Sequence, residues 1–450
     1  MKSGKENAAE VPAMDWGRLI CDKRLGMEEY HDERHHTRSD FQRDYDRLIF
    51  SSPFRRLQNK TQVFPLPGSV FVHNRLTHSL EVSSVGRSLA NEVAIRLSGK
   101  YSDPDILRKL ADVRDIVAAA CLCHDMGNPP FGHGGEKTIS AFFSEGSGSR
   151  FCDMLTEQQW SDLINFEGNA NSFRLLTHEF KGRRRGGMAM TYSTLASIVK
   201  YPYTSLHSGS KGKFGFFQSE EEIYRRVAAQ LGIPELAPGV FARHPLVYIM
   251  EAADDICYQI MDLEDAHKLK ILSLHEVSGL LLDFFPAERR PRIERSMARL
   301  EDPNEKIAYL RSISIGEMVE SCAEVFFAAE ERILRGEFVG SLVAGMDSRL
   351  RDAYAACAEV AGNRIYCAPD VVNIELAGNH ILTSLMEALV EAVTNPDRNY
   401  SRLLLNAVPR QYDTRADSLY GRLQSVLDHI SGMTDVYALD LYRKLNGHSL

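Results

Sequence analysis

Two histidines and two aspartates of this 450-residue chain stand where apolar sequence would hold them away from water. They are His78 in an amphipathic segment, His124 and Asp125 at the end of the run VRDIVAAACLCHD, and Asp254 within VYIMEAADDICY. A buried charge is costly unless it pairs with another charge or coordinates a metal. We therefore expect these four side chains to meet around one divalent cation.

The donor set limits the choice of metal. Two imidazoles and two carboxylates form a mixed nitrogen and oxygen site that suits Mn, Mg, Fe, Co or Zn, and we expect Mn or Mg. Asp255 is a rival to Asp254, since it is the next residue in the same segment. Taken alone, the His124–Asp125 dipeptide is a weak signal, and a salt-bridged pair at a helix end explains it better.

The segment GHGGE offers groups that could move a proton. His133 could protonate a leaving oxygen, and Glu136, three residues later, could orient or protonate the imidazole at helical spacing. Gly132, Gly134 and Gly135 would let the backbone approach a substrate closely. Without its neighbours, His133 would be interpreted as an exposed loop histidine.

Helical patterns surround these residues. In the segment 75–98, apolar residues recur at multiples of four and form one stripe. Asp112 can cap the next helix, which is apolar almost all round and is therefore expected to be buried. A third helix is expected to start at Pro245, a favoured first-turn position. The stripe residues of the first helix are Leu76, Leu80, Leu89, Val93 and Leu97.

The remaining sequence predicts an all-α fold. Residues 61–74 hold prolines, a glycine and β-branched residues, which indicate a loop or a small ribbon. Residues 272–346, 374–393 and 416–446 show mostly helical patterning. Strand-like alternation is scarce, so we predict a helical bundle with an extended C-terminal helical region.

Composition narrows the setting of the protein. The net charge is −8, so the surface as a whole does not attract nucleic acid. The eight cysteines include no CxxC pair, which favours a reducing, cytoplasmic environment. The N-terminus lacks the apolar core of a signal peptide. No apolar stretch approaches the roughly 20 residues of a membrane span, so we expect no membrane partner.

Six ordered segments are similar to the deoxyguanosine triphosphate triphosphohydrolase family of the HD phosphohydrolase superfamily, and a weaker one, ISGMTDVYALDLYR (430–443), extends the likeness. The resemblance implies a substrate-reading N-terminal extension over 1–60, an HD-type catalytic bundle over 61–270, and a C-terminal helical region over 271–450 for oligomerisation and pocket completion. The six segments are RRLQNKTQVFP (55–65), NRLTHSLEV (74–82), HDMGNPPFGHGGE (124–136), NFEGNA (165–170), TLASIVKYP (194–202) and YIMEAADDICYQIMDLEDA (248–266).

The resemblance also implies a reaction. Family members convert a deoxynucleoside triphosphate, with dGTP the expected preference, and water to the deoxynucleoside and inorganic triphosphate. Family metal ligands fall on His78, His124, Asp125 and Asp254. The family's catalytic pair falls on His133 and Glu136. The residue types suit this chemistry, since a divalent ion lowers the pKa of bound water from about 15.7 towards 7.

Further residues are expected to bind the substrate. Arg75 is one turn from His78 on the same helix face, and the resemblance assigns it to phosphate. Tyr258 and Asp262 follow Asp254 at i+4 and i+8 on one stripe. Asp262 would bind the 3′ hydroxyl, and a ribose 2′ hydroxyl would crowd Tyr258. The family likeness adds Lys200 and Tyr201 as phosphate contacts, and Gln58 and Asn59 as contacts to the sugar or base.

Two other functions compete with this interpretation. One is another HD-type nucleotide phosphohydrolase or phosphodiesterase. The other is a regulatory protein that binds nucleotides or single-stranded DNA through the basic, glycine-containing loops 181–187 and 204–215. A solvated loop without function is the favoured interpretation of both loops. Relatives form homo-oligomers, often hexamers, and Arg443 or Arg422 is a candidate to complete a neighbour's pocket.

Three other histidine-containing stretches are not expected to bind metal. HDERHH (31–36) lies in a charged segment and indicates a solvated face. THEF (177–180) lacks the second histidine of a zinc-protease helix. His244 precedes Pro245 and indicates a helix boundary.

Overall fold

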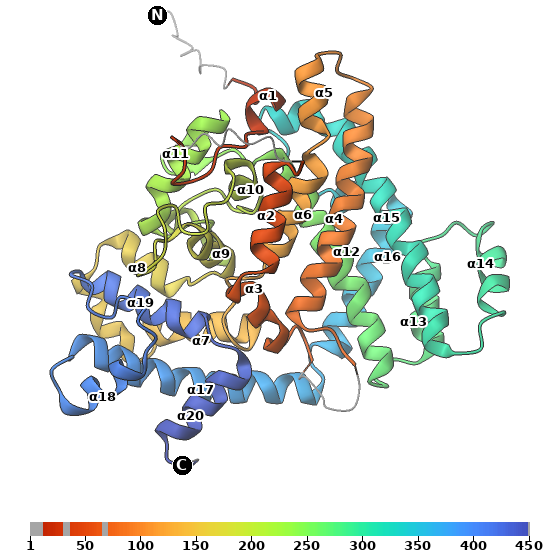
Figure 1. Cartoon of the computed structure of the whole chain (residues 1–450). Helices are drawn as coiled ribbons and strands as arrows, with labels where there is room; N and C mark the ends of the chain where they lie inside the picture. The colour runs from red at the N-terminus through yellow and green to blue at the C-terminus, as the bar shows by residue number, and fades with distance from the viewer. Residues whose placement is uncertain (1–11, 30–36, 65–70, 449–450) are drawn as a thin grey trace, which may run out of the picture.

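The computed structural model describes residues 12–29, 37–64 and 71–448. These residues form twenty α-helices and one small ribbon, which confirms the predicted all-α fold (Figure 1). The first ten are α1 (Trp16–Leu19), α2 (Asp40–Ile49), α3 (Ser52–Arg56), α4 (Arg75–Ser98), α5 (Pro104–Leu110), α6 (Val113–Cys123), α7 (Gly132–Ser144), α8 (Glu157–Ile164), α9 (Gly168–Thr177) and α10 (Tyr192–Ser197). The others are α11 (Glu221–Leu231), α12 (Pro245–Lys268), α13 (Leu274–Leu282), α14 (Arg290–Met297), α15 (Pro303–Leu334), α16 (Ser348–Val360), α17 (Pro369–Thr394), α18 (Asn399–Ala407), α19 (Leu419–Ser431) and α20 (Asp435–Leu445).

Short elements connect these helices. The ribbon pairs β1 (Glu235–Ala237) with β2 (Val240–Phe241) in antiparallel fashion. Thr61 and Asn74 form an isolated antiparallel bridge, in keeping with the loop or ribbon predicted there. The short 3-10 helices are η1 (Leu57–Asn59), η2 (Ser147–Met154), η3 (Ser205–His207), η4 (Gly209–Lys211), η5 (Gln218–Glu220) and η6 (Val343–Gly345), and η7 (Ala361–Ile365) is a π-helical turn.

Helix α4 lies at the centre of the molecule and packs on α6, α12 and α15 (Figure 1). It starts with a capping box, because the Asn74 side chain accepts from the Thr77 N–H and satisfies an end donor. The buried face differs from the predicted stripe. Leu80 is 40% exposed, whereas His78 is buried together with Val82. The multiples-of-four pattern therefore held for the second half of the helix but not for the turn around His78.

Helices α6 and α12 follow their predicted bounds closely. The residues of α6 from Ile116 to Cys123 are fully buried or nearly so, as its apolar sequence predicted. Asp112 takes the N-cap position but makes no side-chain capping hydrogen bond, so the predicted cap is wrong. Helix α12 begins at Pro245, and the His244 side chain accepts a hydrogen bond from the Leu246 N–H at 3.2 Å. The N-terminus of α12 thus uses His244 as its cap.

The C-terminal helices lie against α7, the helix that contains His133 and Glu136. Helix α17 runs alongside α7 and packs on it as well as on α18, α19 and α20 (Figure 1). A second apolar cluster joins residues such as Phe143 and Leu163 to Leu385 and Leu423. The predicted division at residues 60 and 270 stays a prediction. None of the helices in the described ranges has the length and apolar character to cross a membrane.

Close packing of α4, α6 and α12 depends on a glycine. A Cβ atom at Gly86 would lie 2.6 Å from Cys121 Sγ and 3.2 Å from Val117. We expect Gly86→Ala to lower the free energy of unfolding by about 1–3 kcal/mol, because overpacking shifts buried side chains. Denaturant unfolding measures this effect.

Gly316→Ala is the matched control for Gly86→Ala. Gly316 lies within α15 with nothing near its missing Cβ, and alanine there should add about 0.5–1 kcal/mol through helix propensity. Equal effects of the two substitutions would contradict the packing described for Gly86.

Candidate active site

Three helices bring the expected metal ligands together. One nitrogen or oxygen atom from each of His78, His124 and Asp125 lies within 4.8 Å of the others. Asp254 on α12 joins them, since its Oδ1 lies 3.1 Å from His78 Nε2 and 3.5 Å from His124 Nε2. Asp255 lines the same pocket, but no contact with either imidazole places it in the cluster.

His124 has the arrangement of a metal-binding histidine. Its Nδ1 donates to the Cys121 carbonyl at 2.6 Å, so that the tautomer leaves Nε2 free as an acceptor. That Nε2 atom is buried and has no hydrogen-bond partner. A buried imidazole nitrogen is rarely left in this way, and it points at the carboxylates of Asp125 and Asp254. These donors fit a divalent cation.

Arg75 sets the charge state of Asp125. The two side chains form an ion pair of 2.6 Å, and both are largely buried. Burial raises the pKa of Asp125, but Arg75 and His124 outweigh it and bring that pKa to about 2. Asn128 adds a hydrogen bond of 2.5 Å to the other carboxylate oxygen. Asp125 is thus a carboxylate at neutral pH, the form that a metal ligand needs.

His133 and Glu136 form a hydrogen-bonded pair in the first turn of α7. The His133 Nδ1–H donates to Glu136 Oε2 at 3.0 Å. This bond raises the pKa of His133 above its ordinary value, so more imidazolium is present at neutral pH. The glycines around His133 contact protein rather than open space, because a Cβ at Gly135 would lie 2.1 Å from the Pro130 carbonyl oxygen.

The N-terminus of α9 holds Glu136 in place. Glu136 Oε1 accepts from the Gly168 N–H at 2.9 Å. A Cβ at Gly168 would lie 2.0 Å from Asn128 Oδ1 and 2.5 Å from Glu136 Oε1, so no larger residue fits. Glu167 caps α9 and accepts from Lys213 Nζ at 2.6 Å. This contact brings Lys213 3.8 Å from Glu136.

A cavity of about 270 Å³ is lined both by His78, His124, Asp125 and Asp254, here called the metal-type cluster, and by the His133–Glu136 pair. Most of the expected site residues line it. Four residues that the sequence did not single out also do so, namely Gln62, Asn128, Asn169 and Lys213. The lining residues expected from the sequence are Arg75, His78, His124, Asp125, His133, Glu136, Lys200, Tyr201, Asp254 and Tyr258. Lys213 comes from loop 204–215, for which a solvated loop was the favoured interpretation.

Three expected substrate contacts lie away from the cavity wall. Gln58 and Asn59 are exposed on the turn η1, while Gln62 occupies the wall. Asp262 is buried beside it and accepts a hydrogen bond from the Tyr366 hydroxyl at 2.7 Å. The Tyr366 ring lies 6.0 Å from that of Tyr258. Tyr366 follows the π-helical turn η7, and its sequence carries no periodic signal that would have identified it.

The chain is similar to known protein families and to named relatives. The HD domain profile matches residues 75–164, and that of the phosphohydrolase-associated domain matches residues 344–444. A deoxyguanosinetriphosphate triphosphohydrolase-like protein of Pseudomonas aeruginosa is 37% identical over 97% of this chain and 99% of its own length. The chain belongs to the deoxyguanosinetriphosphate triphosphohydrolase family. The like-named protein of Synechocystis is 38% identical, covering 97% of this chain and 100% of that protein.

A relative with the unqualified family name is also similar. The deoxyguanosinetriphosphate triphosphohydrolase of Yersinia pestis is 32% identical over 90% of this chain and 93% of its own length. The family is therefore one of HD-domain hydrolases. The HD-matched region holds five of the six expected metal and proton-transfer residues on α4 to α7 and the loops beside them, but Asp254 lies beyond it.

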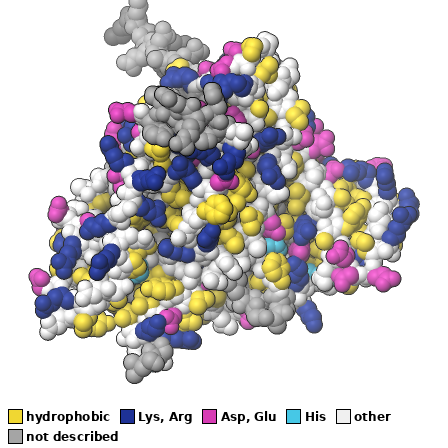
Figure 2. All heavy atoms as spheres, viewed as in Figure 1, with side chains coloured by type: hydrophobic (Ala, Val, Ile, Leu, Met, Phe, Trp, Pro, Cys, Tyr) yellow, Lys and Arg dark blue, Asp and Glu magenta, His cyan; other side chains and the backbone are white. Residues whose placement is uncertain are grey.

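The stretches not expected to bind metal lie elsewhere. HDERHH (31–36) falls outside the described residues. His178 contacts Glu220 at 3.8 Å, away from the cavity. Lys181 of loop 181–187 pairs with Asp413 at 2.7 Å. On the face in Figure 2, Lys and Arg side chains form several groups among acidic and apolar ones.

The charge on Glu136 should control the titration of His133. We expect Glu136→Gln to lower the pKa of His133, because a neutral amide no longer favours the imidazolium. Histidine-resolved NMR titration measures it, with the signal identified from its loss in His133→Gln. Glu145→Gln, at the exposed end of α7, should leave that pKa in place. An unchanged titration in Glu136→Gln would contradict the pairing.

Proposed function

We propose that the protein is a metal-dependent deoxynucleoside triphosphate triphosphohydrolase that prefers dGTP and releases the deoxynucleoside and inorganic triphosphate. The observation that carries this proposal is the buried cluster of His78, His124, Asp125 and Asp254. It opens into the same cavity as a hydrogen-bonded His133–Glu136 pair and several cationic side chains. The names of the Yersinia pestis and Pseudomonas aeruginosa relatives support the choice of substrate.

The four-residue cluster would hold one divalent ion, with Mn or Mg the proposed metal. When bound, such an ion activates water and polarises a phosphoryl oxygen. The free Nε2 of His124 and the ionised carboxylates of Asp125 and Asp254 fit this role. Arg75 keeps Asp125 ionised and adds a positive charge at the phosphate end of the cavity.

His133 would donate the proton that the leaving 5′ oxygen requires. Glu136 favours the protonated imidazole and fixes its Nδ1–H, so that Nε2 is the atom available for transfer. Glu136 itself is anchored by the Gly168 N–H and stays near Lys213. Proton transfer and orientation are thus supplied by α7 and the start of α9.

Cationic and polar side chains would bind the triphosphate. Lys200, Lys213 and Arg75 line the cavity, and a triphosphate needs several converging donors. Their present carboxylate partners, Glu251 for Lys200 and Glu167 for Lys213, hold the two ammonium groups in place.

Aromatic side chains would select the sugar. Tyr258 lines the cavity and lies against Tyr366, so a ribose 2′ hydroxyl would have little space there. Asp262 does not line the cavity and accepts from the Tyr366 hydroxyl, so its contact with the 3′ hydroxyl stays a prediction from the family resemblance. Gln62 lines the cavity wall, whereas Gln58 and Asn59 do not. We further propose a cytoplasmic homo-oligomer, with a hexamer and single-stranded DNA binding as the states to test.

Product analysis tests the function. Metal-loaded protein is incubated with each dNTP and with GTP, and we expect inorganic triphosphate from dNTPs, fastest from dGTP, and much less from GTP. His124→Ala should lower kcat/KM at least about 100-fold, because one metal ligand is lost. His178→Ala, which lies away from the cavity, is the control. Release of monophosphate or pyrophosphate, or full activity in His124→Ala, would contradict the proposal.

A further inference from the structure

The segment between Asp125 and His133 is fastened to the C-terminal helices by a buried lysine. Lys60 is 2% exposed, and its Nζ donates to the carbonyl oxygens of Asn128 at 2.5 Å and Ser431 at 2.7 Å. Asn128 in turn donates its side-chain amide to Asp125. One buried amino group therefore links the segment after Asp125 to the C-terminal end of α19.

Asp435 makes a second link between the same parts. Its Oδ1 accepts from the Phe131 N–H at 3.0 Å and its Oδ2 accepts from the Thr61 N–H at 2.8 Å. Asp435 is buried at the start of α20. Each carboxylate oxygen thus holds a different backbone segment, and the one at Phe131 is two residues from His133.

Phe131 needs such support because its backbone is strained. Its φ is 62°, a left-handed conformation that is unfavourable for a large side chain. It occupies the N-cap position of α7, where no side-chain capping hydrogen bond forms. Helix α17 closes the other side, since a Cβ at Gly378 would lie 2.6 Å from the Phe131 ring. The turn into His133 is therefore held in place by C-terminal residues.

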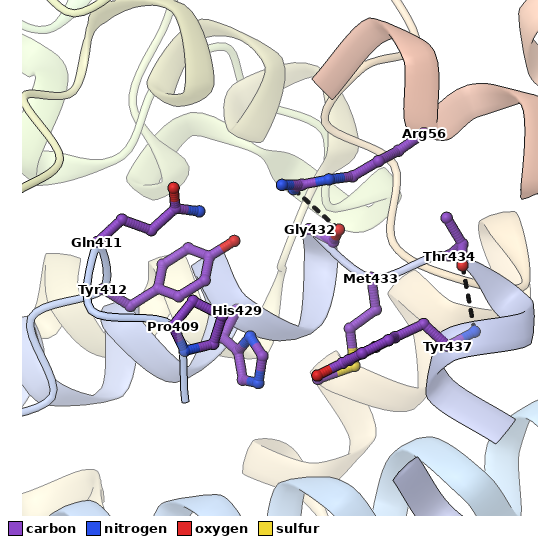
Figure 3. Close-up of a pocket in the computed structure, with 9 residues that line it drawn as sticks. All are labelled: Arg56, Pro409, Gln411, Tyr412, His429, Gly432, Met433, Thr434 and Tyr437. Atoms are coloured by element: carbon purple, nitrogen blue, oxygen red, sulfur yellow. Dashed lines mark hydrogen bonds between the residues drawn. The ribbon is translucent and has the colours of Figure 1, made fainter. Parts of the chain in front are cut away.

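The loop that carries these contacts is itself fixed. The Arg56 guanidinium donates to the Gly432 carbonyl at 3.0 Å, and Thr434 accepts from the Tyr437 N–H at 3.1 Å (Figure 3). Arg56, Lys60 and Thr61 thus contact Gly432, Ser431 and Asp435, respectively. Residues 56–61, 128–131 and 431–435 therefore contact one another at one junction.

We propose that Lys60 and Asp435 are positioning residues, which set the place of His133 relative to the metal-type cluster through the backbone from Asn128 to Phe131. This inference rests on the proposed function for its kinetic test. The region that matches the phosphohydrolase-associated domain then completes the active site of its own chain. A displacement of about 1 Å in a catalytic group can cost roughly 100-fold in rate.

Asp435→Asn tests the proposal, because an amide has one carbonyl oxygen and can accept from only one of the two N–H groups. We expect kcat for dGTP to fall about 10- to 100-fold while KM changes less than about threefold. The control is Asp440→Asn on the same helix, which removes an exposed pair with Lys444 and should leave kcat unchanged. Lys60→Met, which keeps an apolar stem, is the second variant and should behave like Asp435→Asn.

Hydrogen–deuterium exchange of nucleotide-free protein gives a readout that does not need activity. We expect faster exchange over residues 126–135 in Asp435→Asn than in Asp440→Asn, with the core of α4 unchanged. If wild-type protein releases no triphosphate, the proposed function fails, while exchange still decides the positioning. Equal exchange and equal kcat in the two variants would overturn the inference. If Asp435→Asn lowers kcat, raises KM and lowers the thermal stability together, this general structural effect would also overturn the inference.

Discussion

The arrangement of the site depends on the cost of burying His124. Its Nε2 atom is buried and has no hydrogen-bond partner, although the Asp125 carboxylate lies 3.6 Å away and the Asp254 carboxylate 3.5 Å away. Burial lowers the pKa of His124, but Asp125 and Asp254 reverse this and bring it to about 9. Without a cation at the site, a protonated His124 would thus have to neutralise the Asp125 and Asp254 carboxylates. A divalent cation at their centre satisfies the same atoms with the histidine neutral.

Helix packing follows from this constraint. His78 and Asp254 lie on α4 and α12, and His124 directly follows the C-terminus of α6. These helices can approach closely because Gly86 and the alanines of α6 present little side chain. The His133–Glu136 pair belongs to a separate layer, formed by α7 and the start of α9 and backed by α17. The rigidity of the turn from Asn128 to Phe131 therefore decides how the two layers meet, and that turn is contacted mainly by residues distant in sequence.

The sequence predicted the parts of this arrangement that local periodicity controls. The helices expected at 75–98 and from Pro245 agree with the bounds of α4 and α12, because capping residues and apolar spacing act within one helix. Those helices brought His78 and Asp254 to His124. The sequence did not predict where Gln58 and Asn59 lie. Both are exposed on the turn η1, and Gln62 lines the cavity wall instead. Lys213 lies in an irregular loop, and Asp435 contacts Thr61 across 374 residues, so neither left a periodic signal.

The central claim is that one cation is shared by residues of three helices beside the His133–Glu136 pair. A crystal grown with Mn²⁺ and measured at the manganese absorption edge tests it most directly. We expect one strong anomalous peak in contact with His78, His124, Asp125 and Asp254 in every chain. A peak held by other residues, such as Asp255 in place of Asp254, or an anomalous map without any peak in the cavity, would contradict it.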